Sequence, residues 1–277
     1  MGNQGYFIIA TALYGIAFTS GLFALLKGKG YRDFIVLALI ILAYIFQLKG
    51  LGLRGVKVES CPLSNVFEVI QFIVWSLVTL HLFIRIILRI KLLGFFCSGF
   101  AFVLGVLSLS VPGWDSAYSV SSLDSNHIVR LHASLSIFSY GAFCLLAIVS
   151  GMYLLQKKAL DDKAFGRFFS FLPSIRDLES SLGRLLLLSL VLYSASVLSG
   201  CLYWWKFPES VELYKLLISL FLWGCYFTTW VCFVRRKIYG KQLARCGAWL
   251  FILAILILIP IELNRMGLSV GVIQMIH

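Results

Sequence analysis

Charged side chains are scarce in this sequence. Only 13% of its 277 residues are Asp, Glu, Lys or Arg, whereas a soluble domain contains roughly 25%. Hydrophobic residues make up 60% of the chain, and the mean hydropathy is +0.94. Runs of at least about 18 apolar residues recur along the chain, and runs of that length cross a bilayer as helices. The composition therefore excludes a soluble globular protein and predicts an all-α polytopic membrane protein.

The sequence also lacks the short motifs of several enzyme classes. None of its seven cysteines forms a CxxC or CxxCH motif, which argues against a thioredoxin-like reductase and a c-type cytochrome. No GxSxG, Walker-type or HExxH motif is present, so hydrolase and phosphate chemistry have no support. The chain is not expected to be an enzyme on its own. Its cysteines are expected to be small apolar residues inside helices.

The apolar runs predict about eight membrane-spanning helices in a single transmembrane domain, residues 1–277. The first run is too long for the apolar part of a signal peptide and follows no Lys or Arg, so it is interpreted as a span. The second run is short, at about fifteen residues, and is expected to tilt little or to extend into its flanks. The predicted limits are 6–26, 34–48, 66–88, 92–111, 133–155, 185–205, 214–234 and 247–263.

The distribution of basic residues predicts the orientation of these spans. The net charge is +12, but the basic residues lie in short loops between apolar runs, which argues against nucleic-acid binding. Seventeen of the 24 Lys and Arg residues fall in the first, third, fifth and seventh loops. Because positive residues concentrate in cytoplasmic loops, these four loops are predicted to be cytoplasmic and both termini to lie outside.

A possible metal ligand and several tryptophans fall on the predicted outer side. The fifth span opens on His132, and the same side holds His127, Trp114, the Trp204–Trp205 pair and His277. Tryptophans also collect at both membrane interfaces without binding anything, so an anchoring role stays open for all three.

Two further polar residues lie near or within the third span. His81 follows the start of that span by fifteen residues, or about 22 Å of helix, so it does not share one ligand directly with His132. An ionisable side chain inside a span is a functional candidate, although a position near the inner boundary weakens this reading. Glu68 lies in the first turn, after a helix cap at Ser64 or Asn65, or instead orients a ligand histidine.

The remaining loops are expected to be structural. The fifth loop contains a basic, aromatic segment, Arg167 to Pro173, that is expected to lie on the inner leaflet. Ser174 is expected to cap the helix that follows, with Asp177 at its third position. The outer-side carboxylates expected to be solvated are Asp115, Asp124, Glu209 and Glu212.

Several segments occur in an order that resembles a known family. They are Cys61–Glu68 before an aromatic span with Trp75, His132–Tyr140 followed by Gly151–Gln156, Leu172–Glu179 leading into Leu198–Gly200, Lys215, Ser219 and Trp223 at intervals of four, and Arg236–Ala244 before the last span. Together they resemble the cytochrome c assembly protein family, the CcsA/CcmC-type haem handlers. The resemblance covers about residues 60–265 and is closest to the eight-span HemX/YpjD-like branch.

This resemblance implies non-covalently bound haem, presented at the outer face by a tryptophan-rich loop between two outer histidines. His132 matches the first histidine and is the implied metal ligand, since a neutral imidazole binds iron and an aromatic floor suits a flat apolar macrocycle. The implied cofactor-binding residues are His132, Trp204, Trp205, His127 and Trp114. The resemblance also implies other cytochrome c maturation membrane proteins as partners, and a multi-pass location in a bacterial inner (plasma) membrane.

Two features depart from the family pattern. The loop 200–209 keeps the Trp204–Trp205 pair but lacks the spaced Trp-x-Trp-Asp motif. Ser269 stands where a second outer histidine is expected, and His277 replaces it only if the tail folds back. These departures favour a haem-handling or accessory role over catalytic haem attachment.

The sequence thus predicts a membrane haem-handling or accessory protein of cytochrome c biogenesis that holds haem at the outer face. The alternative is a non-catalytic scaffold subunit that binds a partner complex and no haem. A small-solute transporter has less support, because no paired, Gly/Pro-interrupted spans or inverted repeats are seen. His127 is a second ligand only in an irregular loop, because a helix that began there would place it about 140° from His132.

Overall fold

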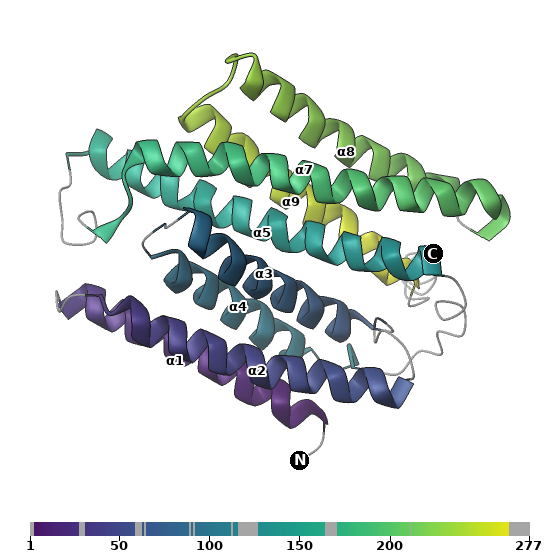
Figure 1. The fold of residues 1–277 in the computed structure, drawn as a ribbon, viewed down its shortest axis with the longest axis horizontal. Helices are drawn as coiled ribbons and strands as arrows, with labels where there is room; N and C mark the ends of the chain where they lie inside the picture. Colours follow the sequence, from purple (N-terminus) through teal and green to yellow (C-terminus); the bar gives the residue numbers. More distant parts are fainter. Residues whose placement is uncertain are drawn as a thin grey trace, which may run out of the picture.

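The computed structural model describes residues 3–27, 31–58, 63, 65–88, 90, 92–111, 113–115, 127–163, 171–210 and 212–265. Within these ranges the chain is all-helical, and eight helices are long and apolar enough to cross a membrane. They run alternately in opposite directions along the bundle (Figure 1). Their bounds are α1 Asn3–Lys27, α2 Asp33–Val58, α3 Val66–Leu88, α4 Leu93–Ser110, α5 His127–Asp161, α7 Ile175–Lys206, α8 Leu213–Val234 and α9 Lys241–Arg265, with a 3-10 helix, η1, at Pro208–Ser210.

Several helices are longer than the apolar runs that predict them. α3 has the expected limits, whereas α2 continues to Val58 and α7 begins at Ile175. The last turns of these helices contain polar residues, but their backbone groups still form helical hydrogen bonds and their side chains find partners. A prediction from apolar runs alone does not include such turns. The second span is therefore not short, and the second and fifth loops contain less chain than expected.

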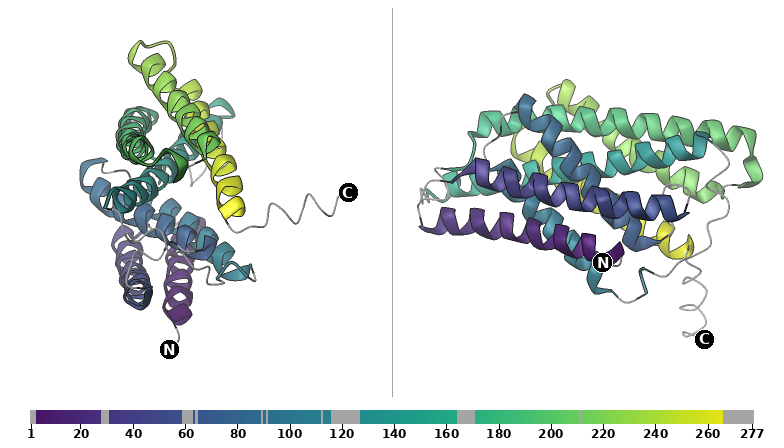
Figure 2. Two further views of the ribbon diagram at one scale, coloured as in Figure 1. Left: turned by 90° about the vertical axis from the view of Figure 1, so that its right-hand side faces the viewer. Right: turned by 60° about the horizontal axis from the view of Figure 1, so that its bottom comes forward.

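The helices form two groups (Figures 1 and 2). The N-terminal group comprises α1, α2, α3 and α4, and the C-terminal group comprises α5, α7, α8 and α9. α5 packs extensively against α7 and α9 and also contacts α3, so it joins the two groups. At Gly141 of α5, an added Cβ would lie 2.9 Å from the backbone nitrogen of Leu77 in α3. The absence of a side chain there allows this close helix approach, as is common in membrane bundles.

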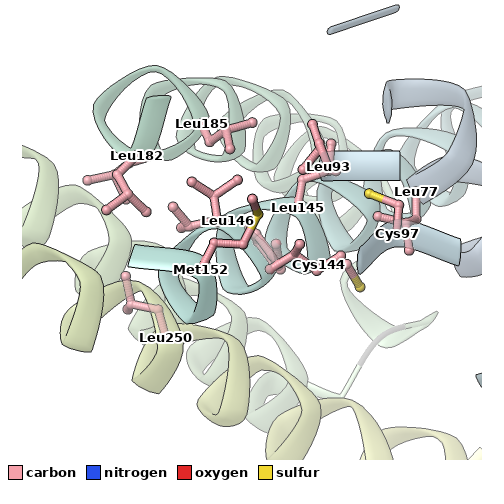
Figure 3. Close-up of a cluster of buried hydrophobic side chains, with 14 of the residues drawn as sticks. Leu77, Leu93, Cys97, Cys144, Leu145, Leu146, Met152, Leu182, Leu185 and Leu250 are labelled. Carbon is pink, nitrogen blue, oxygen red and sulfur yellow. The ribbon is translucent and has the colours of Figure 1, made fainter. Parts of the chain in front are cut away.

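The main apolar core surrounds α5 (Figure 3). Leu145, Leu146 and Met152 of α5 are buried, and Leu182 and Leu185 of α7 belong to the same cluster. Two cysteines, Cys97 and Cys144, are buried in this core, and the described cysteines are free thiols. These two cysteines therefore act as small apolar residues, as expected.

A chain of buried polar side chains crosses the N-terminal group. Tyr14 Oη of α1 donates to Gln47 Oε1 of α2 at 2.8 Å, and Gln47 Nε2 donates to Gln71 Oε1 of α3 at 3.0 Å. Gln71 Nε2 then donates to Ser108 Oγ of α4 at 2.8 Å. One side chain from each helix is thus paired with its neighbour, so these hydrogen bonds hold the four helices in register.

An ion-pair cluster closes the same group at the predicted outer end and corrects one expectation. Arg54 falls beyond the predicted limits of the second span, but it lies in α2 and is only 8% exposed. Its guanidinium donates to Glu68 Oε1 at 3.1 Å and to Asp115 Oδ2 at 2.9 Å, so Asp115 is not simply solvated. Burial alone would raise the pKa of Asp115, but hydrogen bonds from Arg54 and Gln4 hold it below its ordinary value. The burial of Arg54 is tolerated because its charge is paired.

Two predicted helix caps are confirmed. Asn65 Oδ1 accepts a hydrogen bond from the Glu68 backbone nitrogen at 2.8 Å, at the start of α3. Ser174 Oγ accepts one from the Asp177 backbone nitrogen at 3.2 Å, at the start of α7. Both side chains satisfy a backbone donor that the helix leaves unpaired. Most of the predicted inner-leaflet segment falls in 164–170, outside the described residues.

Candidate functional site

A cavity of about 380 Å³ lies between the ends of α5, α7 and α8 that are predicted to be outer. α3 and α9 complete its wall, so all four helices of the C-terminal group take part. Much of the lining is aliphatic, and it includes Val69, Ile73, Val197, Leu216 and Leu258. A largely apolar cavity of this size with a few polar groups is typical of a small-molecule site.

One face of α5 contributes His132, Ser136 and Tyr140 to the cavity. These residues recur every fourth position, and side chains at this spacing share one face of a helix. α5 begins at His127, so the first turns of this long helix carry His132 in regular helical geometry. The candidate ligand is therefore held by a helix and not by a loop.

A hydrogen bond fixes the orientation of the His132 ring. Its Nδ1 lies 2.8 Å from the backbone oxygen of Ser196 in α7. A carbonyl oxygen only accepts, so Nδ1 is the donor in this hydrogen bond. Among the described residues, Nε2 has no hydrogen-bond partner. Metal-ligating histidines commonly have this arrangement, with the second ring nitrogen bound to a backbone carbonyl.

The facing wall of α7 contributes Tyr193, Ser196, Gly200 and Trp204. Their spacing of three or four residues again places them on one helix face. A Cβ at Gly200 would lie 3.1 Å from both Nδ1 and Cε1 of His132. The glycine therefore leaves room for the imidazole to approach α7 and reach the Ser196 carbonyl.

The tryptophan pair is divided by the helix that carries it. α7 continues to Lys206, so Trp204 and Trp205 are consecutive helical residues, about 100° apart around the axis. Trp204 lines the cavity, whereas Trp205 is 81% exposed and is not among the lining residues. The structure thus separates two residues that the sequence grouped together.

The other two predicted site residues also lie elsewhere. His127 is exposed at the start of α5, where its Nδ1 is 2.7 Å from Arg130 Nη2. Because α5 is helical from this residue on, His127 does not share the face of His132, as the 140° argument anticipates. Trp114 packs with Phe7 and Phe67 in the N-terminal group, and its backbone oxygen accepts from the Phe67 nitrogen at 3.3 Å.

His277, Ser269, Asp124 and the alternative cap Ser64 lie outside the described part of the chain. The structure therefore does not test whether the C-terminal tail supplies a second ligand.

A cation stands at the edge of the cavity. Lys215, in the first turn of α8, is a lining residue, and its Nζ lies 2.9 Å from Glu212 Oε2. The hydrogen bond from Lys215 lowers the pKa of the Glu212 carboxyl. Deeper in the wall, Tyr193 Oη donates to the Ser219 backbone oxygen at 3.2 Å, which ties α7 to α8. The cavity thus combines one imidazole, one ammonium group and aromatic rings.

His81 belongs to a different part of the molecule. Its ring is fully buried beside Gly94, at the start of α4, which is the end of the bundle opposite the start of α5. Both ring nitrogens lack a hydrogen-bond partner among the described residues. His81 and His132 therefore do not face a common cavity.

The donor atoms of the cavity favour a metal held in a macrocycle over a bare metal ion. Within the described ranges, no group of three His, Cys, Asp or Glu side chains is placed to hold a metal ion. A bare metal ion is consequently a poor fit, because protein sites for such ions usually supply three or four ligands. A metal carried by its own macrocycle needs only an axial ligand, which a single neutral histidine provides.

Sequence reasoning missed much of this wall. Ser196 acts through its backbone oxygen, which carries no signature in the sequence. Ser136 and Tyr140 follow His132 at steps of four, and this helical spacing was a usable signal for both. Gly200 and Lys215 stood within the family-like segments, but nothing in their spacing linked them to His132.

Comparison with known proteins gives matches over most of the chain. The family model described as cytochrome C assembly protein matches residues 63–269. Protein HemX of Brevibacillus brevis is 30% identical over 198 residues, which cover 68% of this chain and 72% of the relative. Protein HemX of Bacillus subtilis is 29% identical, with 55% of each chain covered. Cytochrome c biogenesis protein CcsA of Trieres chinensis is 31% identical over 44% of this chain and 39% of its own length.

Proposed function

This chain belongs to the cytochrome c assembly protein family, and on that premise we propose that it is a membrane protein of cytochrome c biogenesis that holds haem at the outer face of the membrane. The chain spans 72% of one HemX relative but about half or less of the other two proteins compared. Its activity is therefore argued from its own residues. The eight apolar helices make it an integral, multi-pass membrane protein. We place it in a bacterial inner membrane with both termini outside.

The observation that carries the proposal is the hydrogen bond of His132. The Ser196 carbonyl accepts from Nδ1, so Nε2 is the ring nitrogen that would be left to hold an iron. Trp204, Tyr140 and Tyr203 add aromatic surface to the same cavity. These residues fit a flat apolar macrocycle with a ligand-accepting iron.

His132 would hold the iron, and Trp204 would cover part of the macrocycle. When bound, haem supplies the iron atom that takes up axial ligands and carries the redox chemistry. The aliphatic part of the wall would contact the apolar ring of the ligand. Because His132 is the one histidine among the described lining residues, a second axial ligand would come from another part of the chain or from a partner of the maturation machinery.

An absorption spectrum tests this proposal. The detergent-purified protein is titrated with haem, and spectra are recorded oxidised and then reduced. We expect a Soret band, and a His132→Ala affinity at least about 100-fold lower, because an axial ligand is lost. His127→Ala is the matched control: it removes an exposed histidine of the same helix and should leave the spectrum unchanged. Haem binding that is equal in His132→Ala and the wild type would remove the ligand role.

A scaffold without haem is the second candidate. The degenerate tryptophan motif and the exposed position of Trp205 favour it. A protein that stays colourless throughout the haem titration and co-purifies with a tightly bound partner would establish this role and exclude the first.

A further inference from the structure

We infer that the Lys215 side chain binds a carboxylate substituent of the ligand in the His132 cavity, so that the site selects an acidic macrocycle. This inference rests on the proposed function, because it concerns the same cavity. It adds a second point of attachment, on α8, to the histidine on α5.

Among the described residues that line the cavity, Lys215 is the only Lys, Arg, Asp or Glu. It comes from α8, whereas His132 comes from α5 and Trp204 from α7. A ligand that contacts all three helices would therefore meet an imidazole, an aromatic ring and an ammonium group on different sides. Haem has this pattern: an iron centre, an apolar ring, and two carboxylates on one edge.

Lys215 is paired with Glu212, and this ion pair can be replaced by another carboxylate. The Lys215 and Glu212 side chains are 32% and 58% exposed, and the Nζ to Oε2 distance is 2.9 Å. Exposed ion pairs of this kind contribute little to stability. An incoming carboxylate can thus replace Glu212 at Nζ while Glu212 turns to water. The exchange keeps the lysine charge compensated in both states.

The position at the edge of the cavity distinguishes this lysine from others at the same end. Lys206, the last residue of α7, is exposed and is not among the lining residues. A lysine that only extends to the membrane interface would behave like Lys206. The two lysines therefore form a matched pair with the same charge, the same predicted side of the membrane and different access to the cavity.

The test compares ferric haem with its dimethyl ester, which has the same iron and ring but no carboxylates. Both are titrated into the full-length protein in detergent and followed at the Soret band. We expect the wild type to bind haem about tenfold more tightly than the ester, because a charge-assisted hydrogen bond is lost with the ester. Lys215→Gln should bind both with the wild-type affinity for the ester.

Three further variants sharpen this test. Lys206→Gln should keep the full preference for the free acid, and Lys215→Arg should keep most of it because the charge is retained. Glu212→Gln should strengthen haem binding and leave ester binding unchanged, because it removes the competing carboxylate. If Lys215→Gln does not fold, the Glu212→Gln and Lys206→Gln titrations still decide the question, because Glu212 is the carboxylate that competes at Lys215 Nζ and Lys206 is the charge control.

Different failures have different meanings. Equal wild-type affinity for haem and ester would overturn the role of Lys215 and leave the haem-binding function intact. Equal loss of preference in Lys206→Gln and Lys215→Gln would also overturn it, since surface charge alone would then explain the effect. Absence of binding by either compound would overturn the proposed function itself.

Discussion

The two helix groups differ in the hydrogen-bond partners of their polar side chains. In the N-terminal group, polar residues of neighbouring helices are bonded to one another, as in the chain from Tyr14 to Ser108 and the cluster around Arg54. The C-terminal group also has polar residues paired between helices, such as Tyr193 with the Ser219 backbone, but its His132 and Lys215 border a cavity, and the His132 Nε2 has no partner among the described residues.

This contrast indicates a division of labour. A polar group paired inside a membrane bundle contributes to helix association. A polar group with unused bonding capacity beside a cavity is available to a ligand. We therefore assign structural support to the N-terminal group and ligand binding to the C-terminal group. The predictions below test that assignment, from the largest expected effect to the smallest.

Arg54→Ala should lower the free energy of unfolding by about 3 kcal/mol, because Glu68 and Asp115 lose their common cation. Unfolding can be followed by circular dichroism in detergent. The haem affinity of the folded fraction should not change. A large loss of haem affinity at full stability would contradict the division between the two groups.

Asp115→Asn should lower the free energy of unfolding by about 1.5 kcal/mol at pH 7, since charged hydrogen bonds to Arg54 are weakened. The Asp115 pKa is held low in the folded protein. Its contribution is therefore fully present above the unfolded pKa, about 3.9, and is lost as pH falls through the folded value. The difference between wild type and variant should shrink as the pH is lowered below about 4. A constant difference down to pH 2 would show that the charge is not responsible.

Trp204→Ala should weaken haem binding about tenfold, because a large apolar contact to the ligand is removed. Trp205→Ala, its immediate neighbour on α7, should change the affinity less than about twofold, since this ring points away from the cavity. The exposed Trp249 of α9 is a second control. Equal effects at the two neighbouring tryptophans would mean that the wall of α7 is arranged differently when haem is bound.

His81→Leu tests the exception within the N-terminal group. A buried imidazole with unpaired nitrogens costs free energy, so an apolar side chain of similar size should be neutral or stabilise the fold by about 1 kcal/mol. Thermal unfolding in detergent measures this effect. A loss of more than about 2 kcal/mol would reveal a bonding partner for His81.

The sequence by itself determined the membrane class, the number of spans in the described chain, the caps at Asn65 and Ser174, and the candidate His132. These follow from composition, from apolar runs and from local hydrogen bonding, all of which are properties of short segments. The family resemblance was likewise readable from the order of short segments along the chain, and the family match confirms it.

Only the tertiary structure decided which of the candidate residues meet. It placed Trp204 in the same cavity as His132 and left Trp205 exposed outside it. It also buried Arg54 between α2 and α3 and brought Lys215 to the same cavity. It also supplied the Ser196 carbonyl that orients the imidazole. The physical reason is that these relations join separate helices. They depend on how far each helix extends and how it is rotated in the bundle, which packing sets and no local pattern encodes.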